Sequence, residues 1–114
     1  MEEKFAVELL PEAVEFMNGL DDKSREKIYY NIKKAQLIND KELFKKLNEN
    51  IWEFRTLFKN TAYRIFAFWD KSKKEERIVL ATHGIIKKTN KTPTREIEKA
   101  ENIRKQYLNW KNKK

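Results

Sequence analysis

The sequence lacks several residue types on which common catalytic and metal sites depend. Its 114 residues include no cysteine, one histidine, two glycines and two prolines. Without cysteine, no disulfide, thiolate metal site or thiol nucleophile can form. Two glycines are too few for a glycine-rich phosphate loop, and the single histidine has no serine or cysteine motif beside it for a hydrolase triad. We therefore expect any catalysis to depend on Arg, Lys, Tyr and His side chains, with no metal and no cofactor.

Long apolar runs are also absent. No run approaches membrane-spanning length, and the N-terminal residues do not follow the charged, apolar and small-residue order of a signal peptide. We therefore expect a soluble protein of the cytoplasm that makes no membrane contact. The length predicts a single domain over residues 1–114. A hydrophobic content of 39%, with seven Phe, four Tyr and three Trp, predicts a globular core in which aromatic side chains do much of the packing.

Positive charge is concentrated in the C-terminal part of the chain. The formal net charge is +8. Residues 1–70 contain 12 Lys and Arg against 13 Asp and Glu, whereas residues 71–114 contain 14 against 5. A basic region of this kind attracts a polyanion such as nucleic acid in a salt-dependent way. The alternative interpretation is a solvated lysine-rich face that only keeps the protein soluble.

Hydrophobic periodicity predicts an α+β protein with the order β-α-α-β-β-β-α. The predicted elements are an extended segment at 4–9, a helix that opens at Pro11 and ends at Gly19, a helix capped by Asp21 or Asp22, strands at 51–58, 62–70 and 76–86, and a helix at 93–112. Short polar turns separate the three strands, which favours an antiparallel meander to which the segment at 4–9 can add an edge. The last helix carries an apolar stripe of Ile97, Ala100, Ile103, Tyr107 and Trp110.

Two arginines, Arg55 and Arg64, lie within the predicted strands. An arginine in an aromatic, partly buried strand normally meets a carboxylate, a carbonyl or a ligand phosphate. One interpretation is an ion pair across the sheet, with Glu53 or Asp70 as the carboxylate. The other is a phosphate site, because two arginines on neighbouring strands can share one anion.

The basic segment begins at His83, where the last predicted strand changes from apolar to basic residues. Three lysines follow it, at Lys87, Lys88 and Lys91. Thr92 and Pro93 fit the N-cap and the first residue of the next helix, whose unpaired amides and dipole would face the lysines and form a phosphate site. A solvated loop before an ordinary capped helix is the alternative. His83 itself is interpreted either as a structural histidine that bonds the backbone or as a group that titrates near neutral pH.

Three motifs extend from the first strand of the predicted meander into the last helix. They are W-E-x-R (Trp52, Glu53, Arg55), Y-R-x-x-x-F (Tyr63, Arg64, Phe68) and H-G-x-x-K-K-x-x-K-T-P-x-x-E-I-x-x-A (His83, Gly84, Lys87, Lys88, Lys91, Thr92, Pro93, Glu96, Ile97, Ala100). The sequence thereby resembles the RelE/ParE superfamily of type II toxins, in its HigB-like branch. That resemblance implies a microbial-ribonuclease-like fold, in which an antiparallel sheet has its helices packed on one face.

The resemblance also implies an activity, namely cleavage of mRNA at the ribosome by a metal-independent endoribonuclease. The 2′-hydroxyl would attack the adjacent phosphate, and this needs proton transfer and stabilisation of transition-state charge. Arg64 and Arg55 would meet that charge, and Lys87, His83 and Tyr63 would assist the chemistry. Lys88, Lys91 and Thr92 would bind RNA, whereas the aromatic strand residues Phe54, Phe66 and Phe68 are expected in the core.

Two other functions fit the same residues. A ParE-like protein would inhibit DNA gyrase by binding it, and a non-catalytic nucleic-acid-binding module would account for the charge alone. The lysine-rich segment and the arginines within the strands favour RNA cleavage over gyrase inhibition. The resemblance implies three partners, which are mRNA, the ribosome and a cognate HigA-like antitoxin with a helix-turn-helix fold.

Overall fold

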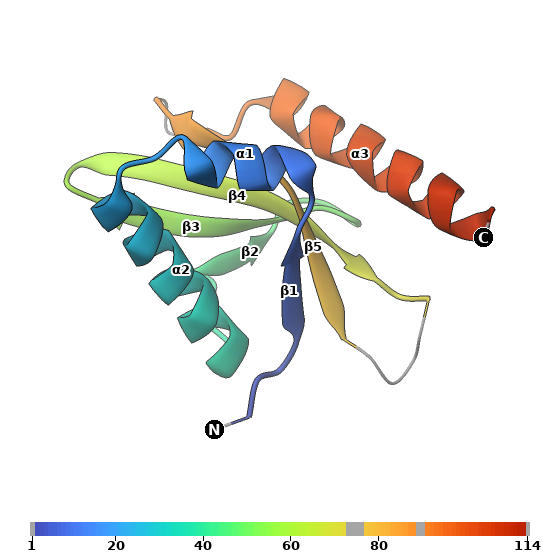
Figure 1. Ribbon diagram of the computed structural model, residues 1–114, viewed down its shortest axis with the longest axis horizontal. Helices are drawn as coiled ribbons and strands as arrows, with labels where there is room; N and C mark the ends of the chain where they lie inside the picture. Colours follow the sequence, from blue (N-terminus) through green and yellow to red (C-terminus); the bar gives the residue numbers. More distant parts are fainter. Residues whose placement is uncertain (1, 73–76, 89–90, 114) are drawn as a thin grey trace.

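The computed structural model describes residues 2–72, 77–88 and 91–113 (Figure 1). Its elements are β1 (Ala6–Leu9), α1 (Pro11–Asn18), α2 (Asp22–Leu37), β2 (Phe44–Lys46), β3 (Trp52–Phe58), β4 (Thr61–Asp70), β5 (Ile78–Lys87) and α3 (Thr94–Asn112). The α+β class and the order of the predicted elements are confirmed. The short strand β2 was not predicted, because three residues are too few to show a period.

All five strands form one sheet in the order β1-β5-β4-β3-β2. Strands β2 to β5 are antiparallel neighbours, as the meander predicted, but β1 pairs with β5 in parallel. The sheet is therefore mixed, which corrects the expectation of a purely antiparallel sheet. Two helices separate β1 from the meander, so the direction of β1 is not set by a tight turn and cannot be read from local sequence.

The turn between β3 and β4 fixes the register of that hairpin. Lys59 and Asn60 have φ values of 50° and 62°, and a two-residue loop with both φ values positive matches the twist of the flanking strands. The hairpin places Arg55 directly opposite Arg64. The turn predicted between β4 and β5 falls mostly on residues 73–76, which lie outside the described residues, as does the predicted start of the last strand at residue 76.

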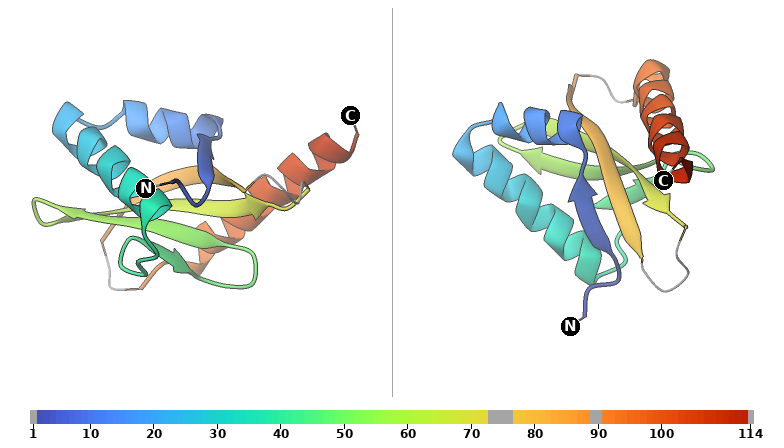
Figure 2. Two further views of the ribbon diagram at one scale, coloured as in Figure 1. Left: turned by 90° about the horizontal axis from the view of Figure 1, so that it is seen from below. Right: turned by 45° about the vertical axis from the view of Figure 1, so that its right-hand side comes forward.

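Helices cover both faces of the sheet. Figure 2 shows α1 and α2 on one face and α3 on the other, which corrects the expectation that the helices share one face. The physical reason lies in β4, where both sets of alternating side chains are apolar: Ile65 and Ala67 pack toward α1 and α2, and Phe66 and Phe68 pack toward α3. A strand that is apolar on both faces needs a layer on each side.

The aromatic core was predicted correctly. Phe54, Phe66 and Phe68 are each at most 2% exposed. Ile97 and Tyr107 pack around the buried Ala100, as the predicted stripe required, whereas Trp110 at the end of that stripe is 55% exposed.

The C-terminal end of α3 is held to the sheet by Asp70, the last residue of β4. The Asp70 carboxylate accepts a hydrogen bond from the Tyr107 hydroxyl at 2.9 Å and another from the Lys111 ammonium. Burial alone would raise the pKa of Asp70, but hydrogen bonds from Lys111, Ser72 and Tyr107 lower it well below its usual value. Asp70 is thus committed to anchoring α3 and is not a partner of the arginines within the strands.

Candidate active site

A cluster of cations lies on the α3 side of the sheet. Arg55 on β3 and Arg64 on β4 are cross-strand partners, so their side chains lie side by side on one face. Lys87 ends β5, the strand on the other side of β4, and its cross-strand partner Ala62 is two residues from Arg64 on that same face. Residues from three strands therefore meet through the sheet register alone.

One buried carboxylate lies between the two arginines. Glu53 is 2% exposed, and its carboxylate oxygens lie 3.6 Å from Arg64 Nε and 3.8 Å from Arg55 Nε. The predicted ion pair across the sheet is confirmed for Glu53 and is wrong for Asp70. Arg55 also has Glu42 at 3.8 Å. The three cations Arg55, Arg64 and Lys87 outnumber these two carboxylates, so the cluster keeps a net positive charge.

The arginines retain unused hydrogen-bond donors. Arg64 Nη1 donates to the Tyr63 carbonyl at 3.0 Å, but among the described residues neither Arg55 Nε nor Arg64 Nε has a hydrogen-bond partner, although both atoms are buried. A buried donor without a partner is costly, and such atoms recur at functional sites. Phosphate oxygens would satisfy these donors, because the guanidinium group presents several N–H groups in one plane.

Thr92 contributes to this cluster and does not cap the following helix. Its hydroxyl donates to Glu53 Oε1 at 3.1 Å. The N-cap of α3 is Pro93, with φ −60° and ψ 132° and no side-chain cap, and the helix begins at Thr94. The predicted cap at Thr92 with Pro93 as the first helical residue is therefore wrong by one position, because Pro93 keeps an extended backbone and itself occupies the N-cap position.

Lys87 lies in a strongly positive environment. The group is half-buried, and burial lowers the pKa of its ammonium. Repulsion from Arg64, Arg55 and Lys45 lowers this pKa further, against the attraction of Glu53. Lys45 lies opposite Glu53 in the β2–β3 pairing and was missed from the sequence, because β2 is too short to be recognised. An amine with a lowered pKa can exchange protons nearer neutral pH than an ordinary lysine.

His83 lies one row further along the same face of the sheet. Its ring stacks on Phe66 with centroids 4.8 Å apart, its Nε2 lies 3.1 Å from Glu96 Oε1, and its Nδ1 lies 2.9 Å from Thr82 Oγ1. Burial lowers the pKa of His83, and the hydrogen bond with Glu96 opposes that effect. Because both ring nitrogens are occupied by side chains, the imidazole ties the first turn of α3 to β5. The expected backbone partner is replaced by Thr82 and Glu96.

The remaining candidates lie apart from the cluster. Tyr63 faces α2 on the opposite side of the sheet, where its hydroxyl bonds Ser24 Oγ at 3.1 Å, so its position does not support a role beside Arg64. Lys88 and Lys91 are exposed and flank residues 89–90, which lie outside the described part of the chain.

Two cavities lie away from the arginines. One has a volume of about 750 Å³, the other about 1100 Å³, and neither is lined by Arg55, Arg64 or Lys87. A cationic cluster outside these cavities suits an extended polyanion better than a small enclosed ligand. Within the described residues, no three His, Cys, Asp or Glu side chains are grouped to hold a metal ion. No described helix has the length and apolar character that crossing a membrane requires.

The mixed sheet with its three helices is consistent with the fold of RelE-like toxins. The chain belongs to the family of phage-derived Gp49-like proteins (DUF891), which matches residues 15–105. This is a RelE/HigB-like toxin family of toxin–antitoxin systems, and membership implies an antitoxin partner. No curated protein matches the chain.

Proposed function

We propose that this protein is the toxin of a type II toxin–antitoxin pair, in the HigB-like branch, and that it cleaves mRNA without a metal ion. The observation that carries the proposal is the cluster of two arginines and Lys87 around Glu53, with two buried guanidinium donors lacking partners among the described residues. Such an arrangement is suited to a phosphodiester whose charge increases during reaction. Family membership supports the toxin role.

In the proposed reaction, the ribose 2′-oxygen attacks the adjacent phosphorus and the 5′-oxygen leaves, which yields a 2′,3′-cyclic phosphate. The new P–O bond and the broken P–O bond lie on opposite sides of a five-coordinate transition state. Arg64 and Arg55 bind its non-bridging oxygens with their unused donors. Lys87, with its lowered pKa, accepts the 2′-hydroxyl proton as an amine and returns a proton to the 5′-oxygen.

His83 has a positioning role in this scheme. Its bonds to Thr82 and Glu96 hold the start of α3 against β5. Thr92, two residues before that helix, in turn fixes the Glu53 carboxylate between the arginines. The exposed Lys88 and Lys91 contribute phosphate contacts to the flanking RNA. We propose that residues 1–114 act as one toxin domain.

We further propose that the message is cut while it occupies the ribosome in the cytoplasm, and that a HigA-like helix-turn-helix antitoxin blocks the toxin. The test is primer extension on a message in a translating extract, with and without the protein. The proposal expects cuts that depend on translation and leave a 2′,3′-cyclic phosphate at the end of the upstream fragment. Intact messages together with failed DNA supercoiling would instead establish the gyrase-inhibiting function, and RNA binding without cuts would establish a non-catalytic module.

A further inference from the structure

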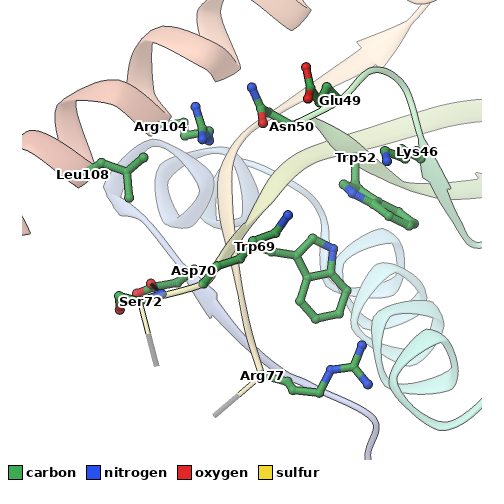
Figure 3. A pocket seen from close by; sticks show the side chains of 11 residues that line it. Lys46, Glu49, Asn50, Trp52, Trp69, Asp70, Ser72, Arg77, Arg104 and Leu108 are labelled. Carbon is green, nitrogen blue, oxygen red and sulfur yellow. Dashed lines mark hydrogen bonds between the residues drawn. The ribbon is translucent and has the colours of Figure 1, made fainter. Parts of the chain in front are cut away.

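The cavity of about 750 Å³ lies at the end of the sheet where β3 begins and β4 ends, away from Arg64 (Figure 3). Trp69 is five residues beyond Arg64 on β4, about 17 Å along the strand. Its lining includes Trp52 and Trp69 from the α2 face of the sheet and Arg104 from α3, which covers the other face. The cavity therefore lies at the end of the sheet, where side chains of both faces meet.

Two indole rings form the aromatic part of this cavity. Trp52 and Trp69 are half-buried, and their centroids are 6.2 Å apart with the ring planes inclined by 74°. Trp52 stacks on the buried Phe44 at 4.7 Å, and Trp69 packs edge-on against Phe5 at 5.1 Å. The core therefore holds both rings in place, so a planar ligand would meet rigid aromatic surfaces.

Positive charge surrounds these rings. Arg77 lies over the Trp69 ring at 5.1 Å, and Figure 3 shows Lys46 beside Trp52. Lys71 also lines the cavity and is exposed. Two carboxylates also line the cavity, Glu49 and Asp70. The Asp70 carboxylate is held by Tyr107 and Lys111, so Glu49 is the one that offsets part of the charge of Lys46, Lys71 and Arg77.

We propose that this cavity binds one nucleotide of single-stranded RNA, outside the cleavage site. The base lies against Trp69 in place of the Arg77 guanidinium, which is then free to contact a phosphate together with Lys46 and Lys71. Stacking on a fixed aromatic ring with cations along the backbone is the physical basis of binding single strands without base pairing. That the cavity helps to hold a message for cleavage rests on the proposed function, whereas the binding of RNA at the cavity does not.

Tryptophan fluorescence tests the inference directly. The parent protein carries Trp110→Phe, so that only Trp52 and Trp69 emit, and the probe is a 2′-O-methyl oligonucleotide that the proposed reaction cannot cut. Saturable quenching is expected, because a stacked base quenches an indole. The variants Lys71→Ala and Arg77→Ala should each weaken binding severalfold and reduce the salt slope by about 1.

The matched control is Lys23→Ala, which removes one exposed charge from α2 and should change neither quantity. Circular dichroism of each variant establishes that the fold is retained. Unaltered quenching in Lys71→Ala and Arg77→Ala would overturn the inference. Equal quenching by polyglutamate of matched charge would also overturn it, because the site would then recognise acidic peptides.

The Arg64→Ala variant separates this inference from the proposed function. It should bind the oligonucleotide at the cavity normally while failing to cut messages. If the protein cuts messages but the cavity variants bind and quench like the parent, the cavity proposal fails and the proposed function stands. If the protein cuts no message and the cavity variants lose quenching, the proposed function fails and the cavity proposal stands.

Discussion

Replacing Arg64 by alanine should abolish most cleavage and also lower stability, for two separable reasons. Arg64 is 7% exposed and lies opposite Arg55, and its Nε atom has no hydrogen-bond partner among the described residues. Loss of one preorganised donor to transition-state charge commonly lowers kcat by about a hundredfold, which corresponds to about 2.7 kcal/mol. Arg64→Lys should restore only part of this activity, because an ammonium group cannot present two donors in one plane.

The stability effect follows from Glu53. At 3.6 Å and an effective dielectric constant of about 20, the Arg64–Glu53 attraction is roughly 5 kcal/mol before desolvation is subtracted. The cost of burying Arg64 and its repulsion from Arg55 offset much of that attraction. Glu53 also keeps Arg55 and Thr92 as partners. We therefore expect Arg64→Ala to cost about 1–3 kcal/mol, or a Tm decrease of about 4–12 °C.

A double variant distinguishes the two effects. Arg64→Met combined with Glu53→Gln removes both charges of the pair, so stability should largely recover. Arg55 still has Glu42 at 3.8 Å in that variant. Cleavage should not recover, because the donor remains absent. Primer extension measures cleavage, and thermal unfolding by circular dichroism measures stability.

Two results would refute this reasoning. Normal cleavage by Arg64→Ala would show that the guanidinium group takes no part in the reaction. Cleavage that returns together with stability in the double variant would show that Arg64 matters only as the ion-pair partner of Glu53. In either case the mechanism proposed for the arginine cluster fails.

Three further predictions concern stability. Burial lowers the pKa of His83 from 6.5, so below that pH the unfolded chain takes up a proton more readily than the folded protein. The free energy of unfolding, measured with urea, should therefore decrease as the pH is lowered from about 7 to about 5. His83→Gln should flatten that decrease; an unchanged slope contradicts the assignment. Gly84→Ala should cost about 1–3 kcal/mol, because its Cβ would lie 2.3 Å from the Phe16 ring, whereas Gly19→Ala meets no contact closer than 3.6 Å and should be tolerated. Equal effects would contradict the packing argument. Asp70→Asn should destabilise the protein at neutral pH. The difference in free energy of unfolding between the variant and the unaltered protein should shrink as the pH falls below about 3.8, because the folded state holds the Asp70 pKa below that value. A difference independent of pH would be evidence against the ionised carboxylate.

Local patterns were sufficient for most elements. Asp21 caps α2 by accepting from Ser24 N, as its position before the apolar repeat predicted. Pro11 opens α1, and the alternating aromatic residues mark β3 and β4. Each of these signals depends on neighbours within a few residues, so the sequence alone carries it. The short β2 and the parallel pairing of β1 carry no such signal, because long-range contacts determine both.

The candidate site shows the same division. The sequence by itself determined that Arg55 and Arg64 lie in strands and that the lysines follow His83. Only the tertiary structure decided that Glu53 forms ion pairs with both arginines, whereas Asp70 accepts a hydrogen bond from Tyr107 of α3. It also decided that Tyr63 faces away from the cluster. The physical reason is that a strand's side chains alternate between two faces, and the sheet register, the covering helix and the competition for each buried carboxylate determine which polar groups meet.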